Sequence, residues 1–124
     1  MTARTHDVAA LTALTLWVLA VPPGKMTIAT GLTAVLANQL GGIAPDIDQP
    51  TAPLWRNLPV GRYFGRVFGA LVGGHRFFCH SLLGVGVFAA LALLLLQIIQ
   101  PIMPNVDIHF VWEAFLTGVV SHLI

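Results

Sequence analysis

The sequence predicts an all-α integral membrane protein, a bundle of about four transmembrane helices with one amphipathic helix in the membrane interface. Three observations predict this fold. Only 9% of the 124 residues are charged, against roughly 25% in an ordinary soluble domain. Residues of apolar type make up 56% of the chain, more than a soluble fold of this size can bury. The apolar residues also gather in four stretches, so we expect residues 1–124 to form a single membrane-embedded domain.

The first apolar stretch runs from Val8 to Val21 and is short for a transmembrane helix. A spanning helix here would have to include His6 and Asp7. A cleaved signal peptide is the alternative, because Arg4 precedes an apolar run that small residues follow. The acidic Asp7 directly before the run favours a retained helix.

Three further stretches complete the predicted bundle. Met26 to Ile43 carries threonines and glycines, which in a membrane usually face other helices, and Pro45 closes it. Leu82 to Ile99 has eighteen residues without a charge. At 1.5 Å per residue it would span ~27 Å, close to the hydrocarbon thickness of a bilayer. The last stretch begins near Ile108 and continues to Ile124.

The link between the second and third stretches contains an amphipathic segment, Val60 to Val72. Its apolar side chains recur at helical spacing, with Arg62 and Arg66 between them. Thirteen residues would reach only ~20 Å, and a crossing would bury both arginines. We therefore expect an interfacial helix rather than a fifth span.

The basic residues predict the orientation of the bundle. With four spans, the N-terminus and the link share one membrane face. That face holds five of the six Lys and Arg residues, all except Lys25. The positive-inside rule makes it cytoplasmic.

The same face collects most of the groups that could bind a metal ion. Imidazole and carboxylate side chains are typical ligands of zinc and similar divalent cations, and ionisable groups at membrane depth usually pair or bind something. Six such residues, from the ends of all four stretches, are expected to meet there: His6, Asp46, Asp48, His75, His80 and His122. His109 and Glu113 fall near the opposite face. His75 and His80 are about 140° apart around a helix, so His75 should precede the third helix and His80 should lie at or near its first turn.

Four motifs in this order resemble the YdjM-like family of membrane-bound, metal-dependent hydrolases. They are Thr5-His6, Pro45-Asp46-Ile47-Asp48, the segment from His75 to Ser81, and Ser121-His122-Leu123. The family is grouped more distantly with zinc-dependent phospholipase C and P1-type nucleases. The resemblance covers the whole chain, but Cys79 stands where the family usually has Thr and Phe77 where it often has Gly. The family also has an acidic residue a few positions after His122, beyond Ile124, so we expect the chain to be truncated at its C-terminus.

The resemblance implies hydrolysis of an ester or phosphoester by metal-activated water, with lipid-derived esters among the candidate substrates. One or two divalent ions, with zinc as the expected metal, would lower the pKa of bound water to near ~7. Asp48 would be a ligand, a residue that orients one, or the general base. Arg76 would hold a phosphate-type oxyanion with its guanidinium fork. Both are therefore catalytic candidates, facing the cytoplasm from the inner membrane.

Two other functions remain open on the sequence alone. One is transport of a divalent ion, although the middles of the spans contain almost no ionisable group. The other is a structural membrane subunit in which a metal ties helix ends together. The expected partners are the lipid bilayer and a small-molecule or lipid ester. A net charge of +1 predicts no binding to nucleic acid.

Overall fold

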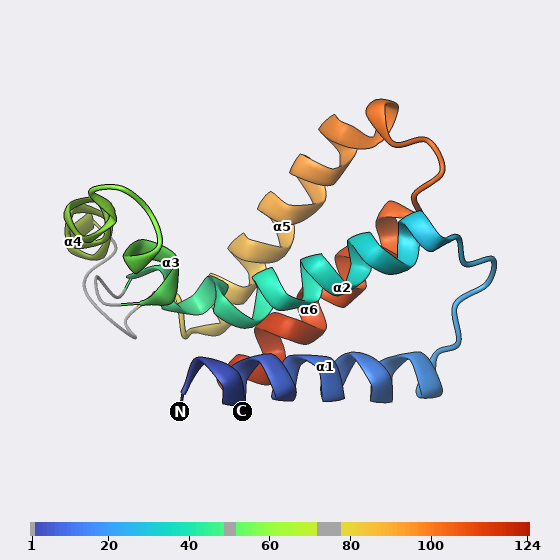
Figure 1. Ribbon diagram of the computed structural model, residues 1–124, viewed down its shortest axis with the longest axis horizontal. Coiled ribbons are helices and arrows are strands. Elements are labelled where there is room, and N and C mark those ends of the chain that lie inside the picture. Colours follow the sequence, from blue (N-terminus) through green and yellow to red (C-terminus); the bar gives the residue numbers. More distant parts are fainter. Residues whose placement is uncertain (1, 49–51, 72–77) are drawn as a thin grey trace.

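The protein is an all-α bundle with a short helical layer across one end (Figure 1). The computed structural model describes residues 2–48, 52–71 and 78–124. The helices follow the chain in this order: α1 (Ala3–Ala20), α2 (Ile28–Ile43), the 3-10 turn η1 (Ala44–Asp48), α3 (Pro53–Arg56), α4 (Gly61–Leu71), α5 (Leu82–Ile99), the 3-10 turn η2 (Gln100–Ile102) and α6 (Ile108–Leu123). The all-α prediction is confirmed.

Side-chain caps set where the long helices begin. The hydroxyl of Thr27 accepts the backbone N–H of Thr30 at 3.1 Å, so α2 starts after Thr27 rather than at the predicted Met26. Ser81 caps α5 by accepting the N–H of Gly84 at 3.0 Å. The boundaries of α5 and the start of α6 agree with the sequence prediction. The first helix begins earlier than the apolar run, at Ala3, and includes both His6 and Asp7.

The core lies where α2 crosses α6, with α1 packed against both. Two glycines allow the crossing. A Cβ on Gly41 would overlap the carbonyl oxygen of Phe115, and a Cβ on Gly118 would overlap that of Asn38. Asn38 is fully buried there, and its amide donates to the Ala114 carbonyl and the Thr117 hydroxyl, both at 3.1 Å. Small residues and a satisfied amide are what close helix contact in a membrane requires.

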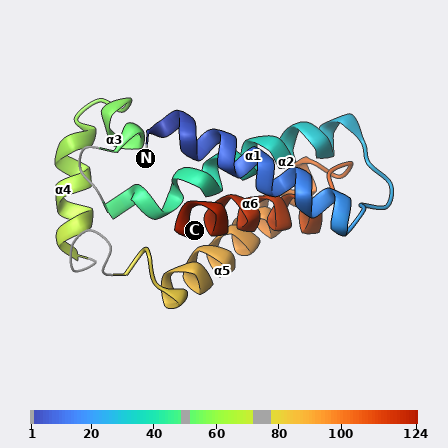
Figure 2. The ribbon, with the colours of Figure 1, turned by 90° about the horizontal axis from the view of Figure 1, so that it is seen from below.

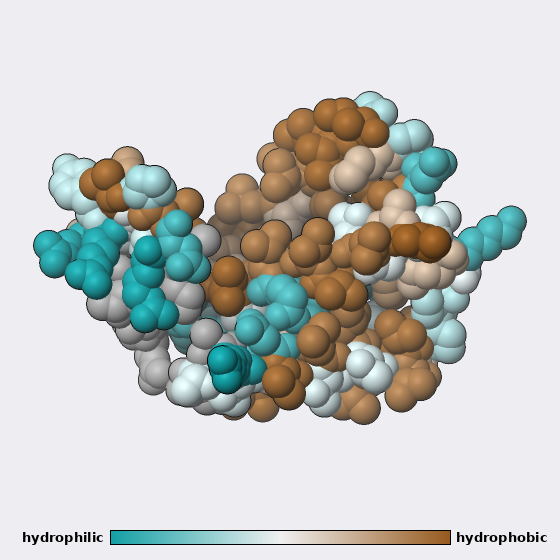
Figure 3. All heavy atoms as spheres, in the orientation of Figure 1, coloured by the Kyte–Doolittle hydropathy of each residue, from teal (hydrophilic) through white to brown (hydrophobic). Residues whose placement is uncertain are grey.

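Helix α5 packs mainly on α6 and diverges from the rest of the bundle (Figure 1). The indole N–H of Trp112 donates to the Ala89 carbonyl at 2.8 Å and joins the two helices. Most of the leucines of α5 remain exposed, and hydrophobic residues cover this part of the molecule in Figure 3. Such a surface fits lipid rather than water.

Helix α4 runs across the end of the bundle instead of along it (Figure 2). It covers Gly61–Leu71 and so begins one residue after the predicted Val60, while the predicted end at Val72 lies outside the described residues. Hydrophilic residues gather at this end in Figure 3. An orientation across the long helices is the one expected of an interfacial helix.

The prediction of about four transmembrane helices is supported only in part. Among the described residues, one segment, Leu82–Ile102, is long and apolar enough to cross a membrane by length and composition, and the apolar α6 is shorter. Helix α1 takes in the charges of Arg4 and Asp7, and α2 has only 16 residues between its Thr27 cap and η1. These local features explain why the first two helices do not meet the same criterion.

Candidate metal centre

Three side chains from three separate elements form a group that could hold a metal ion. They are His6 of α1, Asp46 of η1 and His122 in the last turn of α6. One donor atom from each lies within 4.8 Å of the others. The N- and C-terminal ends of the chain meet at this end of the bundle (Figure 1).

A fourth candidate ligand lies beside this group. The Nε2 of His80 is 3.9 Å from Oδ1 of Asp46, and its ring lies edge-on to that of His122, with centroids 5.3 Å apart. His80 immediately precedes Ser81, the residue that caps α5. It is thus held just before the first turn, as its spacing from His75 predicted.

Local structure explains why Asp46 points into the group. Pro45 is fully buried and follows α2. Because proline has no backbone N–H, it cannot continue the hydrogen bonds of the helix. The chain tightens into η1, which contacts both α4 and α6. The indole N–H of Trp55 donates to the carbonyl of Ile47 at 2.7 Å and fastens this turn from its outer side.

His122 is oriented by a backbone group. Its Nδ1 donates to the carbonyl oxygen of Gly42 at 2.6 Å, which leaves Nε2 directed at Oδ1 of Asp46, 3.2 Å away. In a neutral imidazole this Nε2 carries a lone pair, and the carboxylate oxygen carries another. Two acceptors approach this closely only when a proton or a metal cation lies between them. A histidine whose second ring nitrogen is fixed by a carbonyl is the usual arrangement around protein metal ions.

His6 completes the group in an apolar setting. Its ring stacks on that of His122 with centroids 4.1 Å apart. Its Nδ1 is buried and has no hydrogen-bond partner among the described residues. The neutral imidazole is the form that binds metal.

Asp46 is held in its charged form. Burial raises the pKa of its carboxyl group, but the hydrogen bond from His122 and the charges that His122, His6 and His80 carry when protonated outweigh burial and leave the pKa below its ordinary value. A neutral imidazole and an ionised carboxylate together suit a divalent cation.

The remaining predicted site residues have different outcomes. His75 and Arg76 lie outside the described residues, and so does the side chain of Asp48, whose backbone belongs to η1. Their roles stay predictions. His109 is exposed at the start of α6, at the opposite end of the bundle from the metal group, as expected.

Sequence reasoning missed the backbone and amide partners behind the ligands. The carbonyl of Gly42 orients His122. The amide of Gln39 donates to the Asp7 carbonyl and to Asn38 and so joins α1 to α2 directly behind the site. No sequence motif marks a carbonyl as a partner, because every residue has one.

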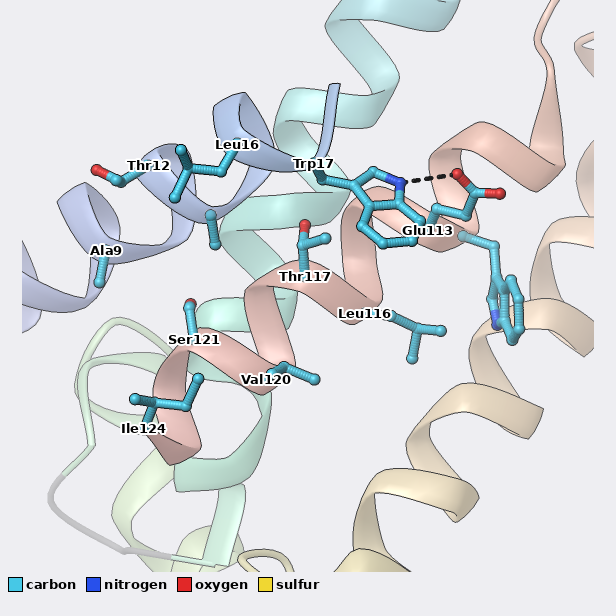
Figure 4. Close-up of a pocket in the computed structure, with 12 residues that line it drawn as sticks. Ala9, Thr12, Leu16, Trp17, Glu113, Leu116, Thr117, Val120, Ser121 and Ile124 are labelled. Carbon is cyan, nitrogen blue, oxygen red and sulfur yellow. Dashed lines mark hydrogen bonds between the residues drawn. The ribbon is translucent and has the colours of Figure 1, made fainter. Parts of the chain in front are cut away.

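An apolar groove of about 710 Å³ runs between α1 and α6 close to this group (Figure 4). At one end are Ala9, one turn after His6, and Ser121, the neighbour of His122. At the other end the indole N–H of Trp17 donates to the Glu113 carboxylate at 2.9 Å. Leu16, Leu116 and Val120 lie along it.

Comparison with known proteins agrees with the motifs. The model of a family described as YdjM inner membrane protein matches residues 1–124. No curated protein and no solved structure matches the chain. The family match and the transmembrane-length helix α5 together assign the protein to the inner membrane. The resemblance drawn from His6, the Pro45-to-Asp48 turn, the His75-to-Ser81 segment and the Ser121-to-Leu123 end is thereby confirmed, and the chain belongs to the YdjM inner membrane protein family.

Proposed function

We propose that this protein is a membrane-bound, metal-dependent hydrolase of esters or phosphoesters. The observation that carries the proposal is the meeting of His6, Asp46 and His122 within 4.8 Å, with His80 beside them. Two neutral imidazoles and a carboxylate are typical ligands of catalytic zinc sites, which leave one coordination position for water or substrate. A divalent cation there supplies Lewis acidity that polarises the bond to be cleaved and makes water a better nucleophile near neutral pH.

The protein's own residues divide the work in this proposal. His6, Asp46, His80 and His122 would hold the cation, with His75 as a further candidate ligand. The Gly42 carbonyl keeps the donor nitrogen of His122 aimed at the site. Asp48, two residues after Asp46, would accept a proton from water or act as another ligand. Arg76 would bind the oxyanion of the substrate.

The groove between α1 and α6 supports a lipid-derived substrate. Its walls are mainly apolar, and its end at Ala9 and Ser121 is next to two of the candidate ligands. An acyl chain could occupy such a groove while the ester group lies near His6 and His122. In this proposal α1, α2 and α6 cross the membrane together with α5, and the metal group faces the cytoplasm because the basic residues cluster at that end.

The interior of the bundle gives less support to ion transport. The buried polar residue partway along α2 is Asn38, and its amide is occupied by Ala114 and Thr117. Gln39 is likewise engaged, by Asp7 and Asn38. A conducted cation needs ligands that can exchange along a path, and these amides are used to hold helices together.

The decisive experiment compares histidines at the two ends of the same bundle. Purified His122→Ala and His80→Ala proteins should lose most of their bound metal and their hydrolysis of p-nitrophenyl esters and bis-p-nitrophenyl phosphate. His109→Ala, a matched control on the exposed start of α6, should keep both. Bound metal is measured by native mass spectrometry. Circular dichroism verifies that each variant is folded. Equal metal content in all three variants would refute the site, and full metal binding without hydrolysis of any ester would refute the enzymatic proposal.

A further inference from the structure

Helix α4 presents three different faces around its axis. Gly61, Gly65 and Gly69 are buried and form the face toward the bundle end. Arg62 and Arg66 follow one another at a spacing of four and form the second face. The third face consists of exposed apolar side chains that no described residue covers: Tyr63, Phe64, Val67 and Leu71.

The glycine face brings α4 very close to α3. A Cβ on Gly61 would overlap the carbonyl oxygen of Trp55. Directly before Gly61, Val60 has a positive φ of 57°, which a β-branched side chain rarely adopts. This backbone conformation lies at the turn between α3 and α4. Together with the close contact at Gly61, it fixes the position of α4 against α3.

A cavity of about 380 Å³ opens at this turn, and two arginines line it. Arg56, the last residue of α3, and Arg62, in the first turn of α4, share the cavity with Trp55, Leu58 and Val60. Among the side chains that the structure describes, no acidic residue lines it. Both arginines are exposed, and among the described residues neither has a carboxylate within salt-bridge distance. Two guanidinium groups in one cavity, next to the positive N-terminal end of a helix, are complementary to an anion with several acceptor oxygens.

We infer that this cavity binds the phosphate group of an anionic phospholipid in the membrane that surrounds the protein. The apolar face of α4 selects a lipid over a free anion, because Tyr63, Phe64, Val67 and Leu71 would enter the acyl region while Arg56 and Arg62 remain at the depth of the headgroups. Aromatic residues beside arginines are typical of helices at that depth. Because α4 lies across the end of the bundle (Figure 2), all of its residues would lie at a similar depth in the membrane.

This inference does not depend on the proposed hydrolase activity. The cavity does, however, connect to the metal group through Trp55, whose indole donates to the Ile47 carbonyl next to Asp46. A lipid bound by Arg56 and Arg62 would therefore steady the turn that carries Asp46.

The test is lipid binding to the full chain in detergent, measured by native mass spectrometry during titration with phosphatidylglycerol or phosphatidylcholine. We expect one phosphatidylglycerol to bind in preference to phosphatidylcholine. Each of Arg56→Gln and Arg62→Gln should weaken it by about fivefold, and the double variant by about 25-fold. Arg66→Gln is the matched control, since Arg66 lies on the same helix but does not line the cavity, and it should change affinity less than twofold.

Three results would overturn the inference. An equal loss in Arg66→Gln would mean diffuse surface charge rather than a site. Equal binding of phosphatidylcholine would remove the anionic selectivity. Displacement of the lipid by inorganic phosphate at the same concentration would show that the cavity selects a free anion. The single variants, checked by circular dichroism, keep the test decisive if the double variant does not fold.

Discussion

Replacing Gly118 by alanine should separate the two helices that hold the metal group in place. A Cβ at this position would overlap the carbonyl oxygen of Asn38 and would lie 2.8 Å from the backbone nitrogen of Gly42. Ordinary contact begins at 3.4 Å, so the Gly42 nitrogen alone requires α2 and α6 to part by about 0.6 Å, and the closer Asn38 oxygen requires more. Neither neighbour can turn away, because both atoms belong to the helix backbone.

The expected loss of stability is about 1–3 kcal/mol, the usual range for an overpacked site. Gly42 also supplies the carbonyl that bonds His122 at 2.6 Å, so the same displacement should disturb the orientation of this ligand. Loss of such an orienting contact typically weakens metal affinity by about 10- to 100-fold. Both effects should appear together in one variant.

Gly86→Ala provides the control, because a Cβ on Gly86 in α5 would meet nothing within 4 Å. Unfolding in denaturant is followed by circular dichroism in detergent, and zinc affinity by competition with a chromophoric chelator. The Gly86 variant should match the parent protein in both measurements. If Gly118→Ala were as stable and bound zinc as tightly as Gly86→Ala, the close approach of α2 and α6 would be wrong.

Three more predictions follow from the core, the site and the membrane orientation. Asn38→Leu should cost about 1–3 kcal/mol of stability in the same unfolding assay, because it removes the buried amide that donates to the Ala114 carbonyl and the Thr117 hydroxyl of α6. Bound zinc should be released as the pH falls, because protons compete with the cation for imidazole and carboxylate ligands; metal content that stays constant between about pH 7 and about pH 4 in a titration would contradict this. Arg62→Cys should react with impermeant thiol reagents only from the cytoplasmic side and Lys25→Cys only from the other side, while the buried Cys79 contributes little labelling. Labelling of the Arg62 position from outside would reverse the orientation.

The helices themselves were largely predictable from the sequence, because their causes are local. The charge-free run predicted where α5 begins and ends. Ser81 and Asp107 cap α5 and α6 through contacts with residues two or three positions away. The amphipathic pattern located the start of α4 to within one residue. Among the described residues only the segment Leu82–Ile102 has the length and composition of a span, because α1 extends into charged residues and α2 is short.

The candidate metal group was predictable as a set but not as a geometry. Topology alone indicates that His6, Asp46, His80 and His122 end at one membrane face, since each lies at the end of an apolar stretch. Which of them approach within a few ångströms depends on the crossing of α2 and α6, and Gly41 and Gly118 decide that crossing by lacking a Cβ.

The orientation of the ligands was decided only by the tertiary structure. The carbonyl of Gly42 and the nitrogen of His122 are 80 positions apart in the chain, and nothing in either residue type specifies the partner. The same holds for the cavity at Arg56 and Arg62, which exists because the chain turns sharply between α3 and α4. The sequence by itself determined which residues form helices and which end of the bundle collects the polar groups, because periodicity, capping and charge act over a few residues. Distances between ligands depend on how helices pack, and packing is a property of the whole fold.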